Sequence, residues 1–288
     1  TNLTYNPTLI AFERVPADEL GLPAGHWRQT VSTGSGRTVR YFDALWRPVL
    51  TRSFDANDEA NTRRVVQNRW DADGRKTFES YPQRDIAAYN TPGIGGHAFD
   101  FDALGRPTLQ VQDSELGKLS TRTEYLAGFQ RRVTNPRGKA STYLYQVFDT
   151  PSEDALWRIW APEGLTVDIF RDVFDKPTVV RRRGSFQGVA QSAQRSYVYD
   201  DYQRLCKTIE PETGATIQDY DTAGNVAWRA SGMNLLGSTS CNRADVPAAR
   251  KVSHTYDARN RLKDTSYGDA SPGIARTYKP DGLLWTLS

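Results

Sequence analysis

The sequence has little of what most enzymes and metalloproteins use at their sites. Its 288 residues include three histidines, two cysteines and a single methionine. The histidines, His26, His97 and His254, are scattered, and the cysteines, Cys206 and Cys241, belong to no C-x-x-C pair, so zinc and thioredoxin-type chemistry lack support. The sequence therefore predicts no metal site, no cofactor and no catalytic residue.

Apolar residues are also sparse. Hydrophobic residues make up 38% of the chain and the mean hydropathy is -0.64, which fits a sheet with much wetted surface better than a compact globule. No apolar run is long enough to span a bilayer, and no signal peptide is visible. Because the sequence starts at Thr1 without Met, we expect a processed form or an excised fragment. A net charge of +3 does not call for a nucleic-acid partner.

Aromatic residues, in contrast, are abundant. They reach 11% of the chain, with 14 Tyr and 7 Trp, and this favours strands. From Trp27 onward, strand-like runs of about five to eight residues alternate with clusters of Gly, Pro, Asn and Asp, which is typical of consecutive hairpins. Residues 1–26 carry three prolines and no clear period, so we expect an irregular lead-in with at most a short helical turn near 17–20.

One unit recurs along the chain. It reads as an aromatic residue, Asp, two variable residues, a turn residue that is usually Gly or Asn, Arg or Asn, and an apolar residue. Its clear copies span 41–48, 70–75, 101–106, 197–205, 219–226 and 255–262. The positions that we single out as structural repeat residues are Tyr41, Asp43, Asp71, Gly74, Asp102, Gly105, Tyr199, Asp200, Tyr220, Asp221, Gly224, Tyr256 and Asp257.

Each position of the unit has a structural explanation. The aromatic ring ends a strand and can stack across strands as a ladder. The Asp carboxylate can accept backbone N–H groups of the turn, and Gly or Asn suits a corner of positive φ. The Arg can pair with that carboxylate or stack on a neighbouring ring. The unit therefore predicts hairpin corners rather than catalysis, and the expected cost of Asp200→Ala is about 1 kcal/mol.

A second turn class, with Pro before Gly, alternates with the first at 135–138, 161–164 and 210–214. Pro presets φ at the first corner of such a turn, and Gly takes the position of positive φ. The distance from the last Gly to the next repeat Asp suits one strand of ordinary length. The chain is therefore predicted to run strand, Asp turn, strand, Pro turn, and to repeat.

The copies at 41–48, 70–75, 101–106, 197–205, 219–226 and 255–262 resemble the YD (tyrosine–aspartate) repeats of the Rhs family. That family includes bacterial Rhs and polymorphic-toxin proteins, the B and C components of insecticidal toxin complexes, and animal teneurins. The resemblance covers residues 27–288. It implies a long sheet of hairpins that spirals into a hollow shell, which in toxin members encloses a C-terminal toxic domain that is carried to a target cell and released.

From these observations we expect an all-β fold of consecutive antiparallel hairpins forming a curved, spiralling sheet, part of a hollow shell. Residues 1–26 would be the lead-in and 27–288 the repeat region, with a loop insertion at about 231–249. The self-cleaving aspartyl-type region and the toxin domain of Rhs toxins are not recognisable, so the chain resembles an interior section of a shell. The resemblance implies the remaining shell and an enclosed C-terminal toxin domain as partners, and a secreted or cell-surface location in bacteria by an unspecified export route.

Several alternatives stay open at this stage. A carbohydrate-binding module at a cell surface would use Tyr, Trp and Arg on the sheet face, and a hydrolase would need paired carboxylates outside the turns. Arginine clusters at 63–64, 131–132 and 181–183 fit solvated strand faces better than a patch for acidic glycans. Cys206 and Cys241 would form a disulfide in an exported chain or remain two free thiols. The insertion is a tolerated surface loop or a loop that contacts a partner.

Overall fold

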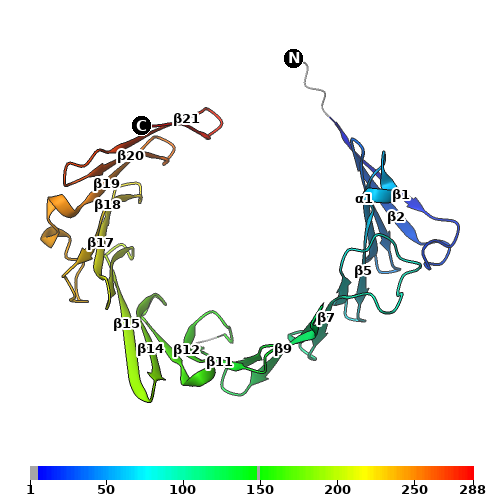
Figure 1. Cartoon of the computed structure of the whole chain (residues 1–288), viewed down its shortest axis with the longest axis horizontal. Helices are drawn as coiled ribbons and strands as arrows, with labels where there is room; N and C mark the ends of the chain where they lie inside the picture. Colours follow the sequence, from blue (N-terminus) through cyan, green and yellow to red (C-terminus); the bar gives the residue numbers. More distant parts are fainter. Residues whose placement is uncertain (1–5, 148–149) are drawn as a thin grey trace. The chain divides into compact units, whose positions relative to one another are not determined.

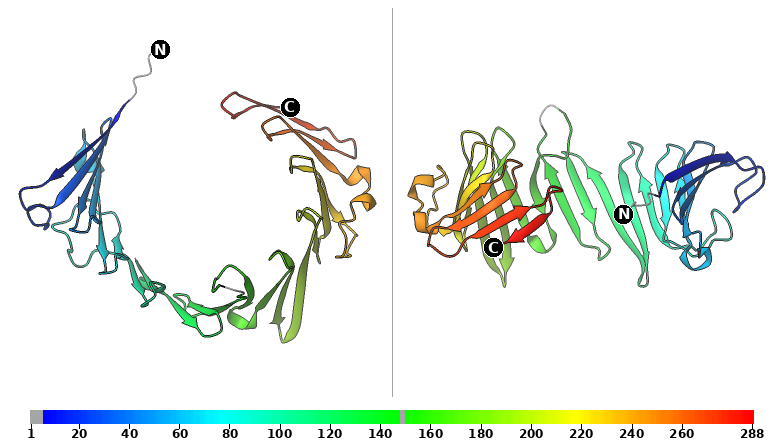
Figure 2. Two further views of the ribbon diagram at one scale, coloured as in Figure 1. Left: turned by 180° about the vertical axis from the view of Figure 1, so that it is seen from behind. Right: turned by 90° about the horizontal axis from the view of Figure 1, so that it is seen from above.

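The computed structural model describes residues 6–147 and 150–288. It divides into two compact units, the first made of Thr1–Tyr125 and Arg132–Ala140 and the second of Leu126–Arg131 and Ser141–Ser288. Nearly all regular structure in either unit is antiparallel β-sheet (Figure 1). Two further views show that the strands of each unit lie side by side in a single layer, with loops at both strand ends (Figure 2).

Strands of 4 to 11 residues follow one another along the described parts of the chain. They are β1 (Thr8–Arg14), β2 (Trp27–Thr33), β3 (Gly36–Phe42), β4 (Pro48–Asp55), β5 (Arg64–Trp70), β6 (Lys76–Ser80), β7 (Gly96–Phe101), β8 (Pro107–Ser114), β9 (Gly117–Leu126), β10 (Gln130–Thr134), β11 (Ala140–Tyr145), β12 (Leu156–Trp160), β13 (Thr166–Arg171), β14 (Pro177–Phe186), β15 (Val189–Tyr199), β16 (Leu205–Glu210), β17 (Gly214–Tyr220), β18 (Val226–Met233), β19 (Val252–Tyr256), β20 (Leu262–Tyr267), β21 (Ile274–Tyr278) and β22 (Leu284–Leu287). The short helical elements are α1 (Glu59–Thr62), η1 (Pro162–Gly164), η2 (Arg243–Asp245) and η3 (Ala248–Arg250).

Within each unit, a strand pairs antiparallel with the strands that precede and follow it in the chain. In the first unit, β3 lies between β2 and β4. In the second unit, β15 lies between β14 and β16. The predicted all-β fold of consecutive antiparallel hairpins is therefore confirmed.

The structure differs from the expected irregular lead-in at residues 1–26. Thr8–Arg14 forms β1, which pairs with β2 along its whole length, from Thr8↔Thr33 to Arg14↔Trp27. Near 17–20 there is a bridge between Glu19 and Leu22 instead of a helical turn. Every residue of β1 is exposed, so no buried face imposes an alternating pattern on its sequence. Residues 1–5 of the predicted lead-in lie outside the described residues.

In the first unit, two long connections fold back over one face of the sheet. They are residues 15–26, between β1 and β2, and residues 81–95, between β6 and β7. Their apolar side chains join those of β3, β4 and β5 in one core. The buried members are Leu22, Val39, Tyr41, Val49, Leu50, Val65 and Ile86. Burial of apolar side chains therefore stabilises this single-layered sheet where a second sheet would otherwise be needed.

In the second unit, one connection plays the corresponding part. The structure places no strand between Met233 and Val252, and residues 234–251 are hereafter called the cap. The sequence predicts a loop off the sheet at about 231–249. The cap instead packs against the sheet, since Val246 is buried together with side chains of β17 and β18. The other buried members of this core are Ala215, Ile217, Ala230 and Met233. In Figure 1 the cap is the orange segment beside β17 and β18.

Candidate functional site

The repeated Asp residues lie at hairpin corners and share one set of hydrogen bonds. At Asp102, the carboxylate oxygen Oδ1 accepts the backbone N–H groups of Leu104 and Arg106, both at 2.9 Å. The Arg106 side chain donates its Nε–H to Oδ2 at 2.8 Å. The same two backbone donors, two and four residues further on, bind Asp43, Asp71, Asp172, Asp200, Asp221 and Asp257. Each carboxylate thus closes its own turn.

Asn135 belongs to the same class of corner. Its Oδ1 accepts the N–H groups of Arg137 and Lys139, as the repeat Asp residues do. Sequence analysis places 135–138 in the second turn class, because Pro and Gly are its most visible residues. An amide oxygen closes this corner as well as a carboxylate does, so the Asn was the informative residue.

The third residue after the Asp takes a positive φ. Gly74, Gly105 and Gly224 have φ of 81°, 78° and 86° at this position. Trp46 and Gln203 occupy it in other copies, each with φ 62°. A bulky residue in this region is a conformational outlier, so these two corners carry backbone strain that the glycine corners lack.

The Arg of one corner reaches the next corner. Arg47 donates from Nη1 to the carbonyl oxygen of Asp71 at 2.7 Å and lies 6.0 Å from the Trp70 ring centroid. In the same way, Arg75 donates from Nη1 to the carbonyl oxygen of Asp102 at 3.1 Å, and its guanidinium lies 5.2 Å from the Phe101 ring centroid. The link therefore propagates from repeat to repeat within the sheet.

The repeat aromatic residues also join neighbouring copies. Tyr220 donates its hydroxyl to the carbonyl oxygen of Leu205 at 2.7 Å, and Tyr256 donates to Val226 O at 3.0 Å. The Arg204 guanidinium lies 4.6 Å from the Tyr220 ring centroid. The sequence predicts a ladder of stacked rings, but at Tyr220 a guanidinium group lies over the ring instead. Arg204 also pairs with the corner carboxylate of Asp200. It therefore contacts both of the partners that the sequence predicts for this position, the carboxylate and a neighbouring ring.

Tyr41 lies in a different place from the other repeat tyrosines. Phe42 precedes Asp43, whereas Tyr41 points into the core, is 1% exposed and donates its hydroxyl to Glu19 Oε1 at 2.8 Å. Burial, together with the hydrogen bond to Glu19, raises the pKa of Tyr41. Its counterpart two residues before Asp200 is Val198, which is also buried. Tyr41 therefore fastens the connection at 15–26 rather than linking two repeats.

The corner carboxylates of Asp200 and Asp257 are held ionised. Burial on its own would raise the pKa of Asp200, but hydrogen bonds from the Arg243 side chain and from the Arg204 backbone and side chain lower it to about 2. Hydrogen bonds from the side chain and backbone of Arg261 lower the pKa of Asp257 to about 2. An acid of this kind is a poor proton donor or acceptor near neutral pH, so the corners do not suit general acid–base chemistry.

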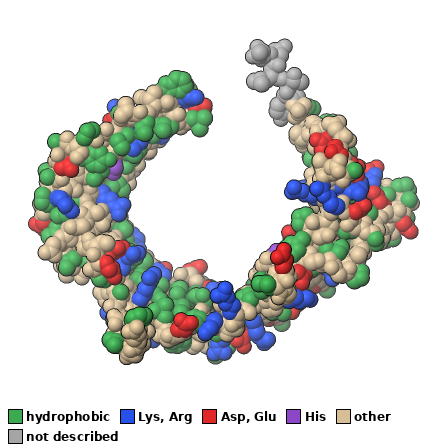
Figure 3. Space-filling model, viewed as in Figure 1, with side chains coloured by type: hydrophobic (Ala, Val, Ile, Leu, Met, Phe, Trp, Pro, Cys, Tyr) green, Lys and Arg blue, Asp and Glu red, His purple; other side chains and the backbone are tan. Residues whose placement is uncertain are grey.

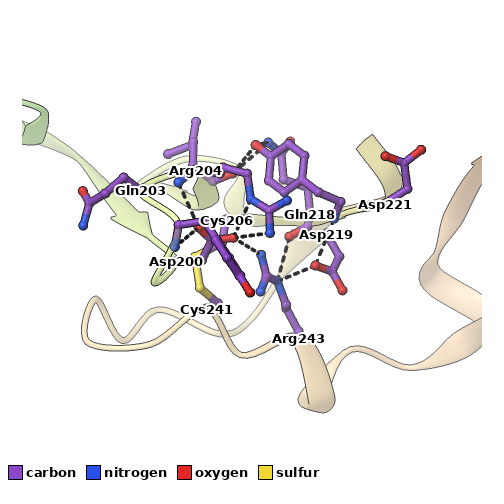
Figure 4. A network of polar contacts seen from close by, with 12 residues as sticks. Asp200, Gln203, Arg204, Cys206, Gln218, Asp219, Asp221, Cys241 and Arg243 are labelled. Carbon is purple, nitrogen blue, oxygen red and sulfur yellow. Dashed lines mark hydrogen bonds and ion pairs between the residues drawn. A yellow bond between two sulfur atoms is a disulfide. The ribbon is translucent and has the colours of Figure 1, made fainter. Parts of the chain in front are cut away.

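Asp200 is the corner to which the cap is anchored (Figure 4). From the cap, Arg243 donates from Nη2 to Asp200 Oδ2 at 2.9 Å, and its Nε lies 3.0 Å from Asp219 Oδ1. Cys206 and Cys241 form a disulfide with a Cα–Cα distance of 5.4 Å, so of the two alternatives the structure shows the bridge. The corner, the strand after it and the cap thus form one connected network.

Lys207 completes this network from β16. Its side chain is fully buried, and Nζ lies 2.6 Å from both Gly237 O and Asn242 Oδ1 of the cap. The sequence patterns did not single out Lys207, Asn242 or Arg243, because their contacts between the cap and the sheet join residues that are 24 (Asp219 and Arg243) to 43 (Asp200 and Arg243) positions apart. A signal was present, however: the residue seven after the repeat Asp is Leu50 or Phe78 in other copies, and Lys is unusual at such a position.

The arginine clusters have acidic neighbours. Arg63 pairs with Glu59 and Asp85, Arg131 with Glu153, and Arg132 with Glu124. In the third cluster, Arg183 binds Asp168, which is 2% exposed and also binds Arg158 from β12. On the face seen in Figure 3, basic side chains are interspersed with acidic ones. This arrangement favours the interpretation as paired strand faces over a patch for acidic glycans.

Four aromatic rings cluster at one corner of the first unit. Phe12, Trp27, Phe42 and Trp46 have neighbouring ring centroids 5.2 to 6.2 Å apart. Trp46 is 53% exposed, Phe12 46% and Trp27 36%. This is a wetted aromatic surface of the kind on which a sugar ring can stack.

Other chemistry has no visible site in the part of the chain that the structure describes. Within residues 6–147 and 150–288, His, Cys, Asp and Glu side chains form no group of three or more that could hold a metal ion. The helices in these ranges are too short or too polar to cross a membrane.

Comparisons with known proteins give similarity in structure only. No family model and no curated protein matches the sequence. Among solved structures, a TcdB2-TccC3-TEV crystal structure matches with a TM-score of 0.53 and 12% identity over 91% of this chain. The Photorhabdus luminescens Tc holotoxin pore matches with a TM-score of 0.52 and 13% identity over the same share.

This chain has a toxin-complex-like fold. It spans only 16% of the matching chain in the TcdB2-TccC3-TEV structure and 15% in the holotoxin pore. At such low identity the likeness concerns the fold alone. This likeness agrees with the fold that the resemblance to Rhs proteins implies, a long sheet of consecutive hairpins.

Proposed function

We propose that this chain is a section of the wall of an Rhs-type β-shell, in a bacterial toxin or cell-surface protein that is secreted or displayed. The observation that carries the proposal is the single layer of consecutive hairpins, similar over 91% of the chain to a Tc toxin-complex structure. The remaining shell and an enclosed C-terminal toxin domain would be its partners. The disulfide between Cys206 and Cys241 supports export, because such bonds persist in oxidising compartments.

The contacts between repeats support a structural rather than a catalytic role. A sheet one layer thick cannot bury both faces, so links between neighbouring hairpins must supply much of its stability. The corner carboxylates already accept two backbone N–H groups each, as at Asp102 and Asp257. Asp168, a buried carboxylate outside the corners, is bound by two arginines. We therefore propose a non-enzymatic protein, and a hydrolase would require two convergent carboxylates free of such partners.

Electron microscopy of the protein together with its flanking sequence would test the proposal. The expected result is a hollow particle whose wall contains these strands, with separate density inside for a cargo domain. A filled β-sandwich, or a wall from which β1–β22 are excluded, would contradict it.

A second candidate is carbohydrate binding, which the exposed rings of Phe12, Trp27 and Trp46 favour. A glycan array with the intact chain tests this alternative. Binding that is lost in Trp46→Ala but kept in Phe174→Ala, an exposed aromatic in the other unit, would support it. An array without any bound glycan would remove it.

A further inference from the structure

The buried amine of Lys207 is the least expected group in the second unit. Lys207 lies seven residues after Asp200, where the copy in the first unit has Leu50, and both side chains are fully buried. Removing an ammonium group from water is costly, so burial lowers the pKa of Lys207. In its uncharged form this amine has a lone pair and is a nucleophile, as desolvated lysines in other proteins are.

The carboxamide of Asn242 lies directly against this amine. Asn242 Oδ1 is 2.6 Å from Lys207 Nζ and also accepts the hydroxyl of Ser240 at 3.1 Å. On its other side, Asn242 Nδ2 donates to Asp245 Oδ2 at 2.7 Å. The Ser240 hydroxyl at the carbonyl oxygen favours the negative charge that develops there when the carbon is attacked. A carboxylate at the nitrogen is placed to move a proton to it.

The neighbouring disulfide holds the two groups together. It joins Cys206 to Cys241, the residues that directly precede Lys207 and Asn242. Lys207 Nζ is fixed a second time by Gly237 O at 2.6 Å. Groups held in this way react as if at very high concentration, which favours even a slow acyl transfer between weak partners.

We propose that Lys207 and Asn242 form an intramolecular amide bond, a second covalent cross-link between β16 and the cap. The Nζ lone pair attacks Cγ of Asn242, the new Nζ–Cγ bond forms, and the Cγ–Nδ2 bond breaks. The proton lost from Nζ passes to the departing nitrogen, which the Asp245 carboxylate contacts, and this nitrogen leaves as ammonia. An amine and a primary amide thus become a secondary amide and ammonia, and no oxidant or other reactant is needed.

This bond would differ from the disulfide in what it withstands. Thiols reduce the disulfide, whereas an amide is inert to them. The cap would therefore stay attached to β16 in a reducing compartment. The inference rests on the geometry of β16 and the cap and does not depend on the proposed function.

Mass spectrometry of the reduced, denatured intact chain tests the proposal. The expected mass is lower than the sequence mass by one ammonia molecule. A tryptic digest should contain one branched peptide that joins the segments around Lys207 and Asn242, without cleavage after Lys207. The sequence mass, with both residues recovered unmodified, would overturn the proposal. So would loss of ammonia with normal cleavage after Lys207, because this marks a succinimide at Asn242.

Variants supply matched controls. Lys207→Arg keeps a long side chain with N–H donors but cannot form the amide, and Asn242→Ala removes the acyl carbon, so both should show the full sequence mass. Asn242→Asp should form the same bond with loss of water. Asp245→Ala should slow the reaction on the order of a hundredfold, which is the scale of general acid–base assistance. Formation at the wild-type rate in Asp245→Ala would contradict the role given to that carboxylate.

Discussion

The two units cover equivalent positions of their sheets in different ways. In the first unit, Leu50 is buried under apolar side chains of two connections, including Leu22 and Ile86. In the second unit, Lys207 is buried under a cap that provides two oxygen acceptors, a disulfide and the ion pairs of Arg243. The same corner architecture thus accommodates an apolar cover and a polar, covalently attached one.

The connection that packs over a buried position, and not the repeat itself, therefore determines which side chain is tolerated there. Apolar burial is non-directional and scales with area, so a cover of this kind tolerates changes of shape. A buried amine depends on acceptors at fixed places, and it becomes a liability when they are absent.

Leu50→Lys should be the most damaging change. It places the residue of the second unit under the cover of the first, where the core is formed by apolar side chains. The expected loss of stability is on the order of 5 kcal/mol, because a buried charge is left without a partner. Chemical denaturation with hydrogen exchange in β3 and β4 measures it. Leu50→Met, the matched control, should cost less than about 1.5 kcal/mol, and equal losses would refute the contrast.

Opening the covalent links of the cap should come next. In Lys207→Arg, which cannot form the proposed amide, reduction of the disulfide opens a loop with a sequence separation of 35 residues. The chain-entropy model gives a loss of about 4 kcal/mol for such a loop. Hydrogen exchange in β16 and β17 would report it. In the wild-type chain, reduction should cost much less stability, because the amide closes nearly the same loop. Similar losses of stability in the variant and the wild type would argue against the amide.

Asp200→Ala should exceed Asp102→Ala. Both carboxylates close a corner, but Asp200 also accepts Arg243 from the cap and its side chain is 5% exposed. We expect Asp200→Ala to lower the free energy of unfolding by about 3 kcal/mol and Asp102→Ala by about 1 kcal/mol, as measured by thermal unfolding. The structure thus raises the expectation from the sequence alone, which was about 1 kcal/mol. Equal effects would mean that the cap contributes nothing at this corner.

Protonation of Asp200 should also make the stability of the second unit depend on pH. The pKa of Asp200 in the folded chain is about 2, below its ordinary value of 3.8. A depressed folded pKa gives stability that is fully present above the unfolded value and is lost as pH falls through the folded one. The acid unfolding of β16 and β17 should therefore steepen between about pH 4 and pH 2, followed by circular dichroism or exchange. In Asp200→Asn this steepening should be reduced, and an unchanged profile would assign it to other groups.

The smallest effect concerns the corner residue of positive φ. Gly74→Ala should cost about 1 kcal/mol from the backbone alone, because no atom lies within 4 Å of the added Cβ. Gln203→Gly should stabilise its corner by a similar amount, since Gln203 already holds φ 62°. Thermal unfolding of both variants is the measurement. Shifts of the same sign would show that strain at this position is unimportant.

Sequence patterns were informative where the determinants are local. The Asp corners depend on residues within four positions, as at Asp43 and Arg47, and their pattern predicts the hairpins. β1 has no buried face, so periodicity could not reveal it. The cap contacts join residues such as Asp200 and Arg243, which are 43 positions apart and carry no common motif. The buried lysine at 207, where Leu50 and Phe78 stand after the copies at 41–48 and 70–75, was a local sign of the cover.

The central claim is that this chain forms a single-layered wall rather than a filled globule, and small-angle scattering tests it most directly. A compact domain of 288 residues has a radius of gyration of about 19 Å. A monodisperse monomer should give a value well above this, because the strands of each unit lie in a single layer. A radius near 19 Å, with the scattering profile of a solid globule, would contradict the account.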